Sequence, residues 1–109
     1  MSITKHTLTV YKGRNSPVKI IVDKDGSPRT FIDDGVTDLG VMIDGTEYKQ
    51  SEGFLAFDNA GEVIFTLGSI PNPPRRKESA RLVEYTTDYP LGRPFITEKT
   101  DYRLYFDFV

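Results

Sequence analysis

The chain has 109 residues, of which 38% are hydrophobic and 28% charged, as expected for one globular domain over residues 1–109. The absence of cysteine excludes disulfides, cysteine-ligated zinc and a thiol nucleophile, and a single histidine excludes a multi-histidine metal site built by this chain alone. Fourteen basic and sixteen acidic side chains leave a net charge of -2. This charge gives no reason to expect nucleic acid or a membrane as a partner, and we expect no cofactor.

The N-terminal third contains strand-like runs separated by turn residues. Thr7–Tyr11 is the first predicted strand. Val18–Asp23 is the second, because its valine and isoleucine residues recur at every second position. The turn Asp23–Gly26 closes this strand, since glycine tolerates the positive φ that such turns need. Thr30–Ile32 is a predicted short return strand.

The middle of the chain predicts two hairpins. Leu39–Ile43 and Thr46–Gln50 flank Asp44-Gly45, and an Asp-Gly pair between two strands favours a type I′ turn. Phe54–Phe57 and Glu62–Leu67 form the next pair, separated by polar residues and a glycine. We expect both pairs to be antiparallel.

The C-terminal third begins with a proline-rich segment. Gly68–Ser79 carries three prolines in four positions, so it predicts a long loop that crosses from one sheet to the other. Arg81–Thr86 and Pro94–Thr97 form a fourth predicted hairpin. Asp101–Val109 is the last predicted strand, with its phenylalanines on one face.

Short strands with frequent turns, and no window of helical periodicity, predict an all-β fold. About eight strands in 109 residues are typical of an immunoglobulin-like antiparallel β-sandwich. The Cys and Trp residues of antibody domains are missing, so we expect a generic sandwich. A small barrel is the alternative.

Two acidic turns and one histidine are the candidates for chemistry. Asp23–Gly26 resembles the start of a calcium loop, but Asp34 stands where the twelfth-position glutamate belongs and Pro28 interrupts the middle. A plain hairpin turn is the favoured interpretation, and Asp33–Gly35 shares a cation with it only if the two turns meet in space. His6 is the only conventional general base near neutral pH, and no nucleophile or orienting group is identifiable around it. We therefore expect no enzymatic activity.

The proline-rich loop is the first candidate contact surface. Pro73 precedes the only basic run of the chain, which consists of Arg75, Arg76 and Lys77. Three positive charges on a loop suit an acidic partner surface or phosphate, and no aromatic residue is interleaved to suit single-stranded nucleic acid. A solvated loop is the competing interpretation.

The apolar C-terminus is the second candidate contact surface. Tyr105, Phe106, Phe108 and Val109 lie within the last five residues, without a polar tail. Such a segment is expected either in the centre of a sheet or against another subunit. Both interpretations stay open at this point.

A carbohydrate-binding or host-adhesion module is the alternative function. Tyr85 and Tyr89 are its candidate residues, with Tyr102 and Tyr105 as further tyrosines expected at the surface. The absence of tryptophan weakens this alternative. A small enzyme or enzyme inhibitor is a third possibility, but no grouping of residues in the sequence supports catalysis.

The order of these signals is similar to immunoglobulin-like domains of tailed-phage virion proteins, in particular the N-terminal domain of phage baseplate upper proteins. The similarity covers about residues 8–98 and consists of turn and strand signals. Those signals are, in chain order, Val10-Tyr11-Lys12-Gly13, the strand Val18–Val22 with Asp25-Gly26-Ser27-Pro28, Asp38-Leu39, the strand Gly61–Leu67 and the hairpin Arg81–Thr97. The join Arg29–Val36 is longer than in the family.

The resemblance implies a virion structural protein of the tail, baseplate or collar, or a decoration adaptor. Such a protein binds other virion proteins in multiple symmetric copies and catalyses nothing. We expect no signal peptide and no membrane span. The resemblance implies a protein that is synthesised in a host cytoplasm and resides in the virion.

Overall fold

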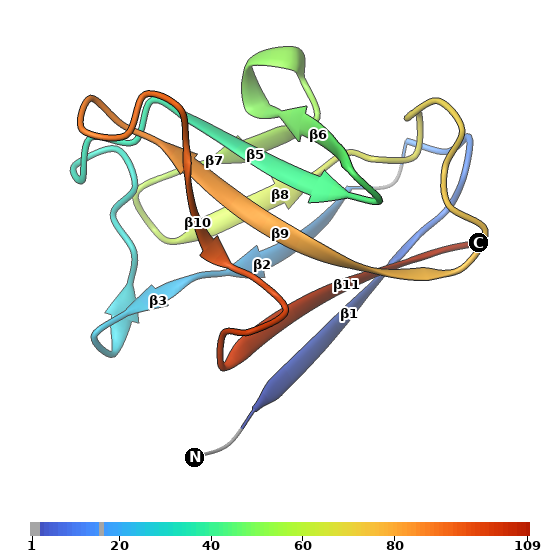
Figure 1. The fold of residues 1–109 in the computed structure, drawn as a ribbon, viewed down its shortest axis with the longest axis horizontal. Coiled ribbons are helices and arrows are strands. Elements are labelled where there is room, and N and C mark those ends of the chain that lie inside the picture. Colours follow the sequence, from blue (N-terminus) through green and yellow to red (C-terminus); the bar gives the residue numbers. More distant parts are fainter. Residues whose placement is uncertain (1–2, 16) are drawn as a thin grey trace.

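A computed structural model describes residues 3–15 and 17–109 and is all-β (Figure 1). Over these residues the chain forms eleven strands and one short 3₁₀ helix. In chain order they are β1 (Thr4–Val10), β2 (Val18–Ile21), β3 (Asp23–Lys24), β4 (Ser27–Pro28), β5 (Asp38–Ile43), β6 (Thr46–Lys49), η1 (Gln50–Glu52), β7 (Leu55–Phe57), β8 (Glu62–Phe65), β9 (Lys77–Tyr85), β10 (Arg93–Ile96) and β11 (Tyr102–Phe108).

The strands pair into two main sheets and a small hairpin. The larger sheet has the order β1-β11-β9-β5-β6, and β10 also pairs with β9. The smaller sheet has the order β2-β8-β7, and β3 and β4 form a separate two-stranded hairpin. Because β9 is nine residues long, it pairs with β11 through its first half and with β10 through its second half. The end of β9 and the start of β11 thus border the same region of the molecule.

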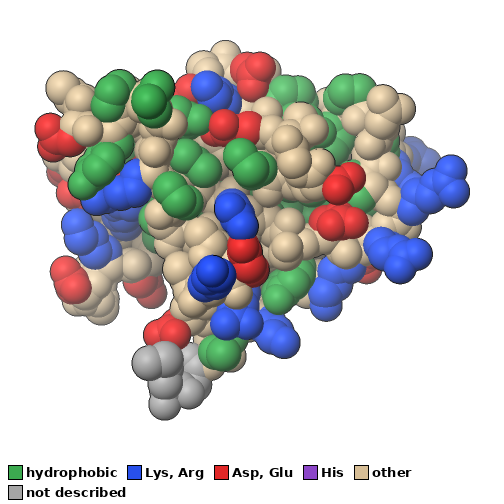
Figure 2. Space-filling view, viewed as in Figure 1, with side chains coloured by type: hydrophobic (Ala, Val, Ile, Leu, Met, Phe, Trp, Pro, Cys, Tyr) green, Lys and Arg blue, Asp and Glu red, His purple; other side chains and the backbone are tan. Residues whose placement is uncertain are grey.

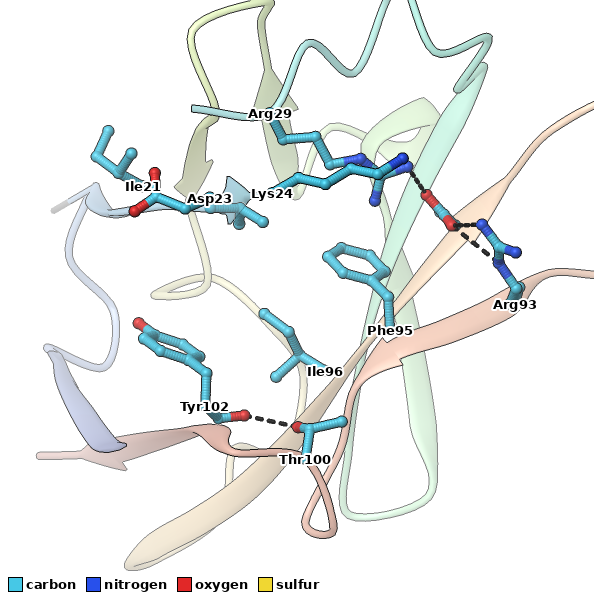
Figure 3. A pocket seen from close by; sticks show the side chains of 11 residues that line it. Ile21, Asp23, Lys24, Arg29, Arg93, Phe95, Ile96, Thr100 and Tyr102 are labelled. Carbon is cyan, nitrogen blue, oxygen red and sulfur yellow. Dashed lines mark hydrogen bonds and ion pairs between the residues drawn. The ribbon is translucent and has the colours of Figure 1, made fainter. Parts of the chain in front are cut away.

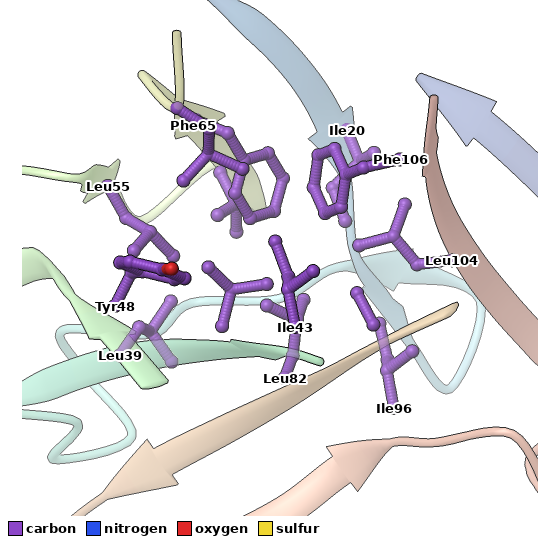
Figure 4. Close-up of a cluster of buried hydrophobic side chains, with 14 of the residues drawn as sticks. Ile20, Leu39, Ile43, Tyr48, Leu55, Phe65, Leu82, Ile96, Leu104 and Phe106 are labelled. Carbon is purple, nitrogen blue, oxygen red and sulfur yellow. The ribbon is translucent and has the colours of Figure 1, made fainter. Parts of the chain in front are cut away.

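A continuous hydrophobic core joins the inner faces of the two main sheets (Figure 4). Alternate residues of β5, β9 and β11 point into it, as the period of two in a strand requires. Phe65 of β8 and Phe106 of β11 meet edge to face across the core, with their ring centroids 5.0 Å apart. Fully buried side chains from both sheets include Leu39, Val41, Val63, Leu82 and Leu104.

The predicted Asp-Gly hairpin is confirmed. Asp44 and Gly45 both have positive φ, 51° and 80°, as a type I′ turn requires, and β5 pairs antiparallel with β6. The hairpin β7–β8 and the antiparallel pair β9–β10 are confirmed as well. The loop before β9 crosses from the smaller sheet to the larger one, as the prolines predicted.

Three local predictions are wrong. Thr30–Ile32 is not a strand, because the main chain turns there through hydrogen bonds such as Asp34 N–H to the Thr30 carbonyl. The proline-rich loop ends at Arg76 instead of Ser79, because residues from Lys77 onward pair with β11. The sheet is also not wholly antiparallel, since β1 runs parallel to β11 along its whole length.

Candidate functional site

The predicted contact segments lie together at one end of the molecule (Figure 1). Lys77 opposes Asp107 in the β9–β11 pair, so the basic run adjoins the C-terminal strand. The loop after β1 joins them, because Lys12 N–H donates to the Val109 carbonyl and Gly13 N–H donates to the Gly68 carbonyl. We call this region the basic end, and its residues are Tyr11, Lys12, Arg14, Pro73, Arg75, Arg76, Lys77, Tyr105 and Val109.

Cations and apolar side chains share the surface of the basic end. Five of the fourteen Lys and Arg residues belong to it, and Figure 2 shows such side chains gathered at the right of the view. Lys77 Nζ lies 5.0 Å from the centre of the Tyr105 ring, at a distance that suits a cation–π contact. Tyr11 and Val109 are each about half exposed among these charges, at 53% and 51%. This mixed surface suits an acidic protein surface that also offers apolar contacts.

Two of the predicted contact residues belong to the core. Phe106 and Phe108 are 0% and 2% exposed, because β11 lies between β1 and β9. Their burial accounts for the apolar C-terminus within a single chain. The partner contact predicted for this strand stays a prediction, and it now depends on Tyr105 and Val109.

A second site, which the sequence did not predict, is a pocket of about 510 Å³ beside the β3–β4 hairpin (Figure 3). Asp23 and Lys24 of β3 lie on one side of it, and Ile96 and Tyr102 lie on the opposite side. Its lining residues are Ile21, Val22, Asp23, Lys24, Arg29, Glu84, Arg93, Phe95, Ile96, Thr100 and Tyr102.

A buried ion network forms one wall of this pocket. Glu84 is 1% exposed and lies between two guanidinium groups. Arg93 donates to Glu84 Oε1 from Nε at 3.0 Å and from Nη2 at 2.6 Å. Arg29, itself 8% exposed, forms an ion pair with Glu84 Oε2 and donates from Nε to Asp34 Oδ2 at 3.2 Å. The carboxylate is therefore compensated by charge on both sides.

Aromatic rings hold both arginines of the network in place. The Arg29 guanidinium lies 5.0 Å from the Phe31 ring centre and 5.4 Å from that of Phe95. Arg93 lies 4.2 Å from the Tyr89 ring centre, and its hydrogen bond to Glu84 raises the pKa of its guanidinium. These contacts fix the positive groups in one wall of the pocket.

Of the two acidic turns proposed as cation sites, one is a tight hairpin turn and the other is held by protein contacts. Asp25 and Gly26 have φ of 54° and 82°, so Asp23–Gly26 is the tight turn of the β3–β4 hairpin. Asp33 accepts a hydrogen bond from Asn59, and Asp34 pairs with Arg29. Within residues 3–15 and 17–109, no three His, Cys, Asp or Glu side chains are grouped to hold a metal ion.

The candidate tyrosines lie in different places. Tyr85 is on the outer face of the larger sheet, where its hydroxyl contacts Glu47, and burial together with this hydrogen bond raises its pKa. Tyr89 stacks under Arg93, and Tyr105 belongs to the basic end. Only Tyr102 lines the pocket, and burial raises the pKa of its hydroxyl.

The comparisons with known proteins identify no relative. No protein-family model matches the chain, and no curated protein and no solved structure matches it. In the part of the chain that the structure describes, no helix is long and apolar enough to cross a membrane.

Sequence reasoning missed the pocket and three residues of the basic end, Tyr11, Lys12 and Arg14, for the same reason. Both join segments that are far apart in the chain, such as Arg29 with Glu84, and Lys12 with Val109. One feature of the sequence could have indicated the ion network. Glu84 occupies the same strand face as Leu82, and a carboxylate at a core-facing position indicates a buried partner.

Proposed function

We propose that this chain is a non-enzymatic structural protein of a tailed-phage virion that docks other virion proteins through its basic end. The observation that carries the docking surface is the meeting of three segments, the loops after β1 and before β9 and the C-terminus, at one end. They bring five cations together there, in a chain of net charge -2, and Asp107 of β11 lies opposite Lys77. The occupant is therefore an acidic protein surface of a neighbouring subunit.

We further propose that the fold is an immunoglobulin-like β-sandwich. In the variable type of that fold, strands C′, C, F and G form one sheet, and B, E and D belong to the other. The order β6-β5-β9-β11 facing β2-β8-β7 supports this assignment. Connectivity supports it too, because β2, β5, β6, β7, β8, β9 and β11 follow in the chain order B, C, C′, D, E, F, G.

The mechanism of docking is repeated contact by a rigid module. A single basic end offers a modest, salt-sensitive contact, and symmetry in a virion repeats it many times. Long-range attraction then guides assembly, while exposed Tyr11 and Val109 supply apolar contact once the surfaces meet. Such a surface requires no cofactor and no catalytic residue.

The test is cross-linking mass spectrometry on purified phage particles from the source of this chain. We expect the chain in the particles, with lysine cross-links from Lys12 and Lys77 to other virion proteins. Particles that lack the chain, or cross-links that arise only from Lys5 and Lys99 at the other end, would contradict the proposal.

Charge reversal tests the surface directly. Arg75→Glu with Arg76→Glu is expected to reduce incorporation into particles at least tenfold, because both side chains are exposed and face the partner. Lys5→Glu with Lys99→Glu changes the net charge equally at exposed positions outside the basic end, and is the matched control. Equal incorporation of the two variants would contradict docking through the basic end.

A further inference from the structure

The pocket beside the β3–β4 hairpin is lined by more charged side chains than packing of the fold requires. Buried ions are costly to desolvate, and apolar residues of similar volume commonly stabilise a fold at least as well. Here Glu84 and Arg29 are nonetheless almost completely buried. Glu84 Oε2 forms an ion pair with Arg29, and Oε1 accepts hydrogen bonds from Arg93. This network places fixed charges along one wall of an open pocket.

The charges around the pocket indicate a neutral ligand. Lys24, Arg29 and Arg93 line it together with Asp23 and Glu84, and Asp34 pairs with Arg29 from behind. Three positive groups thus stand against three negative groups. An anion or a cation would meet repulsion as well as attraction there, whereas a hydroxyl can accept from Lys24 and donate to Asp23.

The remaining walls indicate a ligand with an apolar face. Phe95, Ile96 and Tyr102 lie across the open space from Asp23 and Lys24 (Figure 3). The volume of about 510 Å³ lies within the range of about 300–1,000 Å³ that is typical of small-molecule sites. A sugar ring combines the required features, because its C–H faces are apolar and its rim carries hydroxyl groups that both donate and accept.

We propose that this pocket is a binding site for a neutral saccharide. Phe95, Ile96 and Tyr102 contact the C–H face of a sugar ring, and Asp23 and Lys24 bind its hydroxyls. Glu84 is a positioning residue, which holds Arg29 and Arg93 at the pocket wall through its two carboxylate oxygens. This site does not depend on the basic end, so either proposal can fail without the other.

The experiment is an NMR titration of the full chain labelled with ¹⁵N. The probes are glucose, galactose, N-acetylglucosamine and the disaccharides lactose and chitobiose, with glucuronic acid and a poly-glutamate peptide as charged comparisons. We expect saturable shifts from at least one neutral sugar, confined to amides of β3, β10 and residues 100–102. Glucuronic acid and the peptide are expected to leave these amides unshifted.

Variants in one hairpin give a matched control. Asp23→Asn and Lys24→Met are each expected to weaken sugar binding at least tenfold, because each removes a charged hydrogen-bond partner of a hydroxyl. Asp25→Asn makes the same chemical change at the turn, outside the pocket lining, and asparagine tolerates the φ of 54° there. It is expected to bind as the wild type does.

Three results would overturn the proposal. The first is the absence of saturable shifts from every neutral sugar of the panel. The second is binding of glucuronic acid or the peptide alone, which would assign the pocket to an anionic ligand or to an acidic partner segment. The third is an equal loss in Asp25→Asn and Asp23→Asn, which would place the binding outside the pocket.

Discussion

Glu84 shares the inner face of β9 with Ala80 and Leu82, where an apolar side chain is the rule. It opposes Leu39 of β5, which is completely buried. Its charge is tolerated because Arg93 hydrogen-bonds one carboxylate oxygen and Arg29 pairs with the other. A single residue thereby ties the hairpin region before β5 to the strands β9 and β10.

Replacement of Glu84 by glutamine tests the strength of this tie. Glu84→Gln leaves the nearly buried Arg29 with Asp34 as its remaining ion partner, so we expect a loss of about 3 kcal/mol in the free energy of unfolding. Urea denaturation measures this loss in the free energy of unfolding. Glu98→Gln is the control, because Glu98 forms an ion pair with Arg81 at the surface and its loss is expected to change stability little. Equal stability of Glu84→Gln and wild type would contradict the structural role of the network.

Tyr85 makes stability depend on alkaline pH. Burial and its hydrogen bond to Glu47 raise its pKa above the ordinary value of 10.0, so the folded state favours the neutral phenol. This contribution is fully present below pH 10.0 and is lost as the pH rises through the higher folded pKa. Urea denaturation from neutral pH to about pH 11 is expected to show stability falling above about pH 10, and less steeply in Tyr85→Phe. An equally steep fall in that variant would contradict the prediction.

At the scale of elements, β11 gives the C-terminal segment two faces with different surroundings. It pairs parallel with β1 on one side and antiparallel with β9 on the other. Its inner face supplies Phe106 and Phe108 to the core, and its outer face supplies Tyr105 to the basic end. One strand therefore has a folding role and a predicted docking role on opposite faces.

These two roles can be separated by mutation. Deletion of Tyr105–Val109 is expected to abolish assembly or solubility, because it removes two buried aromatic side chains and most of the strand that pairs with β1. Phe106→Ala alone is expected to cost about 3–5 kcal/mol in thermal or urea denaturation. Tyr105→Ser with Val109→Ser is expected to stay folded and to lose incorporation into particles. A folded truncated chain that still enters particles would contradict both roles.

At the scale of the whole molecule, the two candidate sites are far apart. Lys77 and Glu84 lie at opposite ends of β9, which places the basic end and the ion network about 23 Å apart at the usual rise per residue. That separation exceeds twice the Debye length of about 8 Å at physiological salt. Charges at one site are therefore screened from the other.

Independence of the sites is a measurable consequence. Arg75→Glu with Arg76→Glu is expected to leave the saccharide titration unchanged, and Lys24→Met is expected to leave incorporation into particles unchanged. Higher ionic strength is expected to weaken docking more than sugar binding, because only docking depends on net charge attraction. A loss of sugar binding in the basic-end variant would show that the sites are coupled.

The sequence by itself determined the all-β class, the hairpins and much of the core. Two examples are the alternation of buried residues at Val63, Phe65 and Leu67 and the turn at Asp44-Gly45. Both depend on residues that are neighbours in the chain, so the sequence predicts them directly. It also marked Arg75–Lys77 and the C-terminal strand, although not that they lie side by side.

Tertiary structure alone decided the rest, because long-range pairing depends on which segments the fold brings together. It paired β1 parallel with β11 and extended β9 back to Lys77, which completed the basic end. It buried Phe106 and Phe108 within the chain, and it set Arg29 against Glu84 across a separation of 55 residues (84 minus 29). No local pattern encodes such contacts, so the pocket became visible only in three dimensions.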